Sequence, residues 1–108
     1  MDFTEYQREA TKTAIYPKEK GLEYTALGLC SEAGEVAGKV KKIIRDKDGI
    51  VSEEDSIELA KELGDCIWYC AALANELQMD LNIIAHGNIL KLMLRQEKGT
   101  IRGSGDNR

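Results

Sequence analysis

The chain has 108 residues, 43% of them hydrophobic, and its 19 acidic and 15 basic residues give a net charge of −4. This length suits one small domain with a thin core, and the acidic balance argues against nucleic acid, a polyanion, as a partner. The first residues lack the basic and apolar regions of a secretory signal, and the longest apolar run, residues 66–74, is too short to span a bilayer. We therefore expect a cytoplasmic protein that binds neither nucleic acid nor membrane.

Apolar residues recur at steps of three and four along most of the chain, and no segment alternates as a strand does, which predicts an all-α fold of about four helices. Pro17 should stop the first helix, and Gly99 should end the last. Ser52 and Asp80 are suited to cap the third and fourth helices. The expected helices cover residues 4–15, 21–45, 53–78 and 81–98.

Two segments, CSEAGEVAG (30–38) and AKELGDCIW (60–68), each place two carboxylates three residues apart, so that each pair lies on one side of its helix. Both pairs lie away from the centres of the apolar stripes, and a solvated acidic face would explain that position. The run CIWYCAALA (66–74) argues otherwise, because it is apolar on all sides and indicates a covered surface. A monomer of this size has few helices to cover it, so we expect an oligomer with this run at or beside the subunit interface.

Each pair also has a glycine directly before its second acid, Gly34 and Gly64. Glycine costs about 1 kcal/mol relative to alanine in a helix, but it lets another helix or a ligand approach the backbone. Carboxylates at the edge of a covered surface need protons or cations, and either Lys39 and Lys42 or a metal ion could supply the charge. Two such pairs on antiparallel helices would form an all-oxygen site, the kind that Mg²⁺, Mn²⁺ and Ca²⁺ prefer. The single histidine, His86, lacks the Glu-x-x-His spacing of di-iron bundles.

These motifs resemble those of the MazG-like, all-α nucleoside triphosphate pyrophosphohydrolases. The similarity rests on Glu32-x-x-Glu35, a 26-residue spacer and Glu62-x-x-Asp65, within the phrases LGLCSEAGEVAGKVKK, ELGDCIWYCAALANEL and NILKLMLRQEKG. It extends over about residues 3–108 and implies a MazG-like domain at residues 1–100, with residues 101–108 as a flexible tail. It also implies a helical bundle completed by assembly into a homodimer or homotetramer.

The resemblance implies Mg²⁺-dependent hydrolysis of a nucleoside triphosphate, preferably a deoxynucleoside triphosphate, to monophosphate and pyrophosphate, with Mn²⁺ as a substitute metal. We expect Glu35 to act also as the general base that accepts a proton from the attacking water. A non-enzymatic helical oligomer that binds nucleotide or metal as a regulator is the alternative function. The metal ligands implied by the resemblance are Glu32, Glu35, Glu62 and Asp65.

The last helix supplies the implied substrate contacts Asn88, Lys91 and Arg95, from an N-x-x-K-x-x-x-R pattern. Asn88 lies on a mostly apolar stripe, where a hydrogen bond between helices is the alternative to substrate binding. Trp68 is a candidate for stacking on a nucleotide base, with core or interface packing as the alternative. The tail GSGDNR (103–108) could close over bound substrate or be a frayed end.

Overall fold

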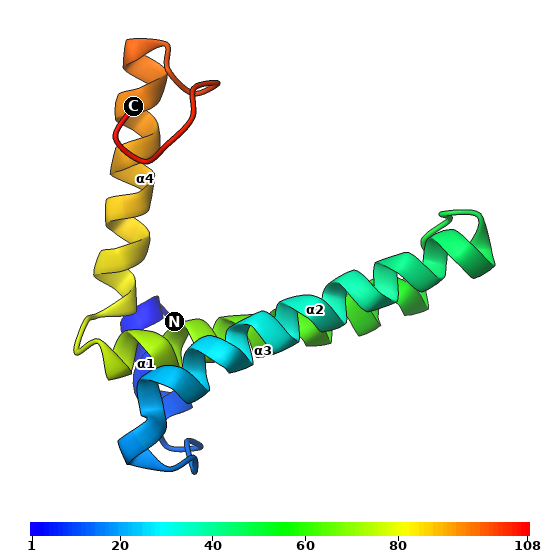
Figure 1. Cartoon of the computed structure of the whole chain (residues 1–108), viewed down its shortest axis with the longest axis horizontal. Helices are drawn as coiled ribbons and strands as arrows, with labels where there is room; N and C mark the ends of the chain where they lie inside the picture. The colour runs from blue at the N-terminus through cyan, green and yellow to red at the C-terminus, as the bar shows by residue number, and fades with distance from the viewer.

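The computed structural model describes all residues from 1 to 108, and its regular secondary structure is all helical, which confirms the predicted all-α fold. α2 and α3 form a long antiparallel hairpin, and α4 projects away from it, so that the molecule has the outline of an L (Figure 1). A single 3₁₀ turn, η1, precedes the hairpin. The elements are α1 Phe3–Thr11, η1 Lys18–Lys20, α2 Gly21–Lys47, α3 Glu53–Glu76 and α4 Leu81–Lys98.

The turn between α2 and α3 sets the register of the hairpin. Asp48 ends α2 in the left-handed region with a φ of 53°, and Gly49 follows with a φ of 75°. Ser52 and Asp55 then form a reciprocal capping box at the start of α3. Lys47 Nζ lies 2.8 Å from Asp55 Oδ1, so the end of α2 is tied directly to the start of α3.

α1 ends at Thr11, earlier than the expected Ile15. Two threonine hydroxyls bond to backbone carbonyls one turn back, Thr11 Oγ1 to Gln7 O and Thr13 Oγ1 to Ala10 O, both at 2.7 Å. Such bonds compete with helix continuation, and the chain leaves the helix well before Pro17. The ends of α2 and α3 differ from expectation by only two residues, which is within the usual uncertainty of helix boundaries.

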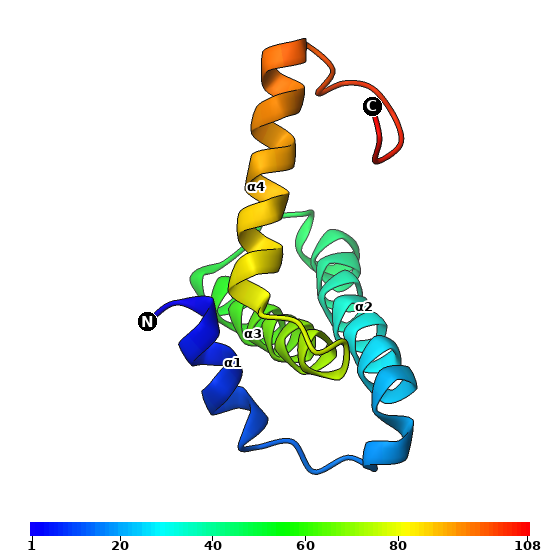
Figure 2. The same ribbon diagram turned by 90° about the vertical axis from the view of Figure 1, so that its left-hand side faces the viewer.

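α3 is the central helix, with α2 packed along one side and α1 along another (Figure 2). Its alanines Ala71, Ala72 and Ala74 are buried, and the core joins two of them to Leu81. The chain's own helices bury these three residues of the apolar run 66–74 and leave Ile67 exposed, so the place of this run at a subunit interface stays a prediction. Small side chains make this arrangement feasible, because alanines let α1 and α2 approach the α3 backbone closely.

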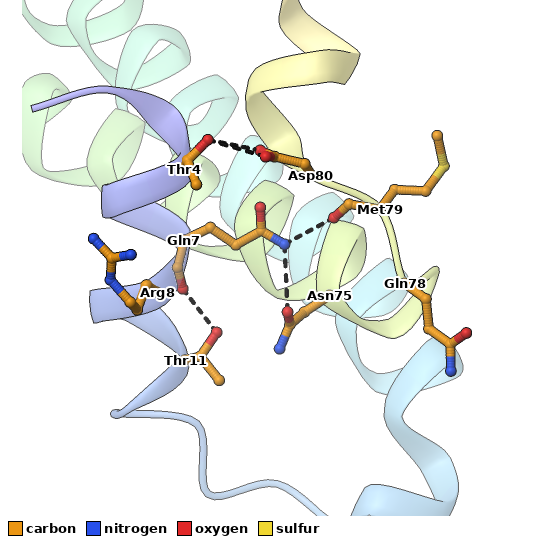
Figure 3. Close-up of a pocket in the computed structure, with 8 residues that line it drawn as sticks. All are labelled: Thr4, Gln7, Arg8, Thr11, Asn75, Gln78, Met79 and Asp80. Atoms are coloured by element: carbon orange, nitrogen blue, oxygen red, sulfur yellow. Dashed lines mark hydrogen bonds between the residues drawn. The ribbon is translucent and has the colours of Figure 1, made fainter.

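Gln7, 8% exposed, anchors the turn from which α4 departs. Its amide Nε2 donates to Met79 O at 2.9 Å and to Asn75 Oδ1 at 3.3 Å (Figure 3). The Leu81 N–H donates to Gln7 Oε1 at 2.7 Å. Thr4 adds a hydroxyl bond to the Asp80 carboxylate at 3.0 Å. The shallow polar cavity of about 480 Å³ beside Gln7 is therefore part of the scaffold that holds α4 in place.

α4 leaves most of its surface uncovered. The radius of gyration is 16.7 Å, against about 13 Å for a compact chain of this length, and only 10 of 108 residues are buried. No helix combines the length and the apolar character needed to cross a bilayer. Large apolar side chains exposed on α4 are Ile83, Ile89, Leu90, Leu92, Met93 and Leu94.

Candidate metal centre

Three of the four acids singled out from sequence meet across the α2–α3 hairpin. Glu32 comes from α2, and Glu62 and Asp65 come from α3; one carboxylate oxygen of each lies within 4.8 Å of the others. The antiparallel register, set at the 48–52 turn, brings the two helix faces together. Oxygens around one Mg²⁺ at about 2.0–2.1 Å are at most about 4.2 Å apart, so small side-chain rotations would fit this trio to such an ion.

The electrostatics of the trio favour a bound cation. Burial raises the pKa of Glu32, and the nearby carboxylates of Asp65 and Glu62 raise it further. Lys39 Nζ lies 3.6 Å from Glu62 Oε1 and offsets part of the negative charge, as its sequence position suggested. One lysine against three carboxylates leaves net negative charge, and an all-oxygen donor set is the kind that hard divalent cations select.

Glu35 is exposed and lies outside the trio, although its charge contributes the smallest of the influences that raise the pKa of Glu32. It lies three residues beyond Glu32 on α2, and its carboxylate is not among the three that meet. An added Cβ at Gly34 or Gly64 would meet nothing within 4 Å. No helix of this chain therefore uses the space that these two glycines leave.

The close approach occurs instead at Gly28, one turn before Glu32. The ring of Tyr69 lies against this glycine, where an added Cβ would overlap it. Tyr24 is 6.4 Å from the Tyr69 ring, centroid to centroid. Burial raises the pKa of Tyr69 most, its interaction with the Tyr24 phenol raises it further, and the charges of Glu32 and Asp65 contribute less.

Tyr24 and Tyr6 were missed as site neighbours from sequence alone. Burial raises the pKa of Tyr6, and the charge of the Asp65 carboxylate raises it further, so this phenol lies within electrostatic reach of the trio. A sequence signal did exist for Tyr24, because Tyr24, Gly28 and Glu32 follow one another at steps of four and so share one side of α2. Nothing in the sequence identified Tyr6, which reaches the site only because α1 packs on α3.

Trp68 faces the segment after α1. Its indole Nε1–H donates to Thr13 Oγ1 at 2.8 Å, and its ring meets Tyr69 edge-on at a centroid distance of 5.0 Å. This contact matches the packing alternative for Trp68. A role in stacking on a base stays a prediction.

The predicted substrate contacts on α4 are not beside the trio in this chain. α4 projects away from the hairpin, and its second half lies far along that projection (Figure 1). Asn88 is exposed, so the stripe on which it was expected to be buried is open. Lys91 and Arg95 both contact Asp106 of the tail, at 2.9 and 3.3 Å. Their contact with substrate stays a prediction, and it requires a rearrangement or a second chain.

Comparison with known proteins agrees with this geometry. The sequence matches the family model of the MazG nucleotide pyrophosphohydrolase domain over residues 20–100, which include all three acids of the trio. It is also 50% identical over 109 residues to the "Gene 37 protein" of Mycobacterium phage L5, covering 95% of this chain and 96% of that protein. No solved structure matches the chain.

Proposed function

The chain belongs to the MazG nucleotide pyrophosphohydrolase family, and on this premise we propose that it hydrolyses a nucleoside triphosphate, preferably a deoxynucleoside triphosphate, to monophosphate and pyrophosphate with Mg²⁺. The observation that carries the proposal is the carboxylate trio on the hairpin, which lies inside the matched region. Metal dependence is typical of the family, and this all-oxygen trio fits it. The finer assignments of substrate and ion rest on the chemistry of these residues.

Glu32, Glu62 and Asp65 would hold the metal, which supplies positive charge for the phosphates and lowers the pKa of a bound water. Glu35 is suited to accept a proton from the attacking water, because its exposed carboxylate is outside the trio. Lys39 keeps Glu62 oriented toward α2 through their ion pair. Tyr24, 44% exposed, stacks on Tyr16 with 5.1 Å between the ring centroids, and its other face is the candidate surface for the base.

The proposal includes assembly into at least a homodimer, with a homotetramer the larger option. The exposed apolar side chains of α4 support it, and Leu90, Met93 and Leu94 line a groove on this helix. A second chain that covered α4 would also be able to bring basic side chains such as its Lys91 and Arg95 toward the carboxylate trio, which these side chains do not reach within one chain. Light scattering at micromolar concentration should show no monomer, and a stable, active monomer would contradict this part of the proposal.

A panel of nucleoside and deoxynucleoside triphosphates with Mg²⁺, assayed for pyrophosphate release, tests the activity. Glu62→Gln keeps the side-chain shape but removes a ligand charge, so activity should fall at least tenfold, or by about 1.4 kcal/mol in transition-state stabilisation. Glu58→Gln is the matched control, because Glu58 lies on the same helix and pairs only with Lys61 at the surface.

No release from any triphosphate would favour the regulatory alternative, a helical oligomer that binds nucleotide without hydrolysis. Near-parent turnover in Glu62→Gln would remove Glu62 from the site. Mg²⁺ should also raise the melting temperature, because a ligand at about 100 times its Kd adds about 2.7 kcal/mol to the unfolding free energy. A purely structural role for the acids predicts no such shift.

A further inference from the structure

An open cavity of about 330 Å³ with a strongly basic lining lies between the second half of α4 and Arg108 of the tail (residues 99–108). Its charged side chains are all cations, a composition that attracts anions. The tail turns back at Gly99, whose φ of 70° ends α4. The basic lining residues are Lys91, Arg95, Lys98 and Arg108.

The tail supplies its own anion to this basic group. Asp106 Oδ1 accepts from Lys91 Nζ at 2.9 Å and from Arg95 Nη2 at 3.3 Å. The same Arg95 nitrogen also donates to the backbone carbonyls of Asp106 at 2.8 Å and Gly105 at 3.4 Å. These contacts leave Arg95 only 6% exposed.

The arginine is nevertheless poorly satisfied. Three acceptors share its Nη2, whereas its Nε is buried without any hydrogen-bond partner. Arginine pairs best through two parallel N–H bonds to the two oxygens of a carboxylate or phosphate, and Asp106 does not reach that geometry. An unpaired buried donor is costly, so the closed tail leaves the Arg95 Nε–H available to a ligand that brings a second acceptor oxygen.

We propose that residues 99–108 form a displaceable strap, in which the Asp106 carboxylate occupies the position of a phosphate group on Lys91 and Arg95. An oligophosphate would displace Asp106 and pair with both the Nε and the Nη2 of Arg95. The strap thereby makes the chain its own competitor for polyanionic ligands. The identification of this ligand with the substrate's phosphates rests on the proposed function, whereas the competition itself does not.

Asp106 is suited to be displaced. Its side chain is 81% exposed, and exposed ion pairs contribute little to stability, whereas an oligophosphate has several charges. Arg108 bonds only within the tail's own turn, to the carbonyls of Thr100, Ile101 and Gly105. The strap can therefore keep its local shape while it moves about Gly99.

Calorimetric titration of the full chain with tripolyphosphate, without divalent metal, tests the competition. Asp106→Asn should bind about tenfold more tightly than the parent, equivalent to about 1.4 kcal/mol. Glu97→Gln is the matched control, because it also removes one negative charge from this end of α4 and Glu97 forms no ion pair with Lys91 or Arg95. Its affinity should stay within about twofold of the parent, and Arg95→Ala should remove the gain from Asp106→Asn.

Equal affinities for Asp106→Asn and Glu97→Gln would overturn the proposal. Because no metal is present and no hydrolysis is measured, this outcome is independent of whether the chain cleaves nucleotides.

Hydrogen exchange on the parent protein needs no variant and tests the movement. The Thr100 amide donates to Arg95 O in the closed tail, so this bond joins the strap to α4. Saturating tripolyphosphate should speed exchange in a peptide covering residues 99–108. Binding with unchanged or increased protection of that peptide would show that the strap stays closed, which would also overturn the proposal.

Discussion

Replacing Gly28 with alanine should destabilise the protein, whereas the same change at Gly34 should stabilise it. Both glycines lie inside α2, where alanine is favoured by about 1 kcal/mol over glycine. At Gly34 an added Cβ meets nothing within 4 Å, so the whole gain should appear. At Gly28 the added Cβ would overlap the ring of Tyr69.

The Tyr69 ring has little freedom to move aside. Two other aromatic rings contact it: Trp68 lies edge-on with its centroid 5.0 Å from that of Tyr69, and Tyr24 is tilted at a centroid distance of 6.4 Å. Overpacking of this kind costs about 1–3 kcal/mol, which exceeds or matches the helix gain. The net loss at Gly28 should be about 0–2 kcal/mol, and the two variants should differ by about 1–3 kcal/mol.

Urea unfolding followed by circular dichroism, at one protein concentration for the parent and both variants, measures the difference. In thermal melts about 1 kcal/mol corresponds to about 4–8 °C for a domain of this size. The displaced ring would also disturb Glu32, one turn further along α2, so Gly28→Ala should weaken Mg²⁺ binding more than Gly34→Ala. Equal stability of the two alanine variants would refute the packing of Tyr69 on α2.

Two further predictions concern parts of the fold away from the acids. Ser52→Ala removes the hydroxyl that accepts from the Asp55 amide at 3.1 Å, and loss of such a cap should lower the unfolding free energy by about 1 kcal/mol, measured by urea unfolding; an unchanged midpoint would contradict the capping role. Burial, and then the hydrogen bond to Glu76, raise the pKa of Tyr16 to about 12. Because this folded pKa lies above the unfolded value of about 10, the stabilisation is complete below about pH 10 and is lost as pH rises toward about 12. The urea midpoint of the parent should therefore fall above about pH 10, and that of Tyr16→Phe should fall less; parallel curves would exclude Tyr16 as the cause.

The helices and the acidic pairs were predictable from sequence because their signals are local. Apolar spacing of three and four residues identified the helical segments, and Ser52 and Asp80 cap α3 and α4 as expected. The end of α1 was missed because the hydroxyls of Thr11 and Thr13 compete with the helix, an effect that periodicity does not register. The family resemblance, based on phrases along three helices, was likewise contained in the sequence.

Which side chains meet was decided only by the tertiary structure. The register of the hairpin brings Glu32 to Glu62 and Asp65 and leaves Glu35 outside, and a shift of one residue would rotate each helix face by about 100°. The tail's return onto α4 depends on a positive φ at Gly99, so the pairing of Arg95 with Asp106 could not be read from their spacing. These contacts join residues through turns whose geometry depends on the packing of the entire chain, whereas a helix forms from interactions within a few residues.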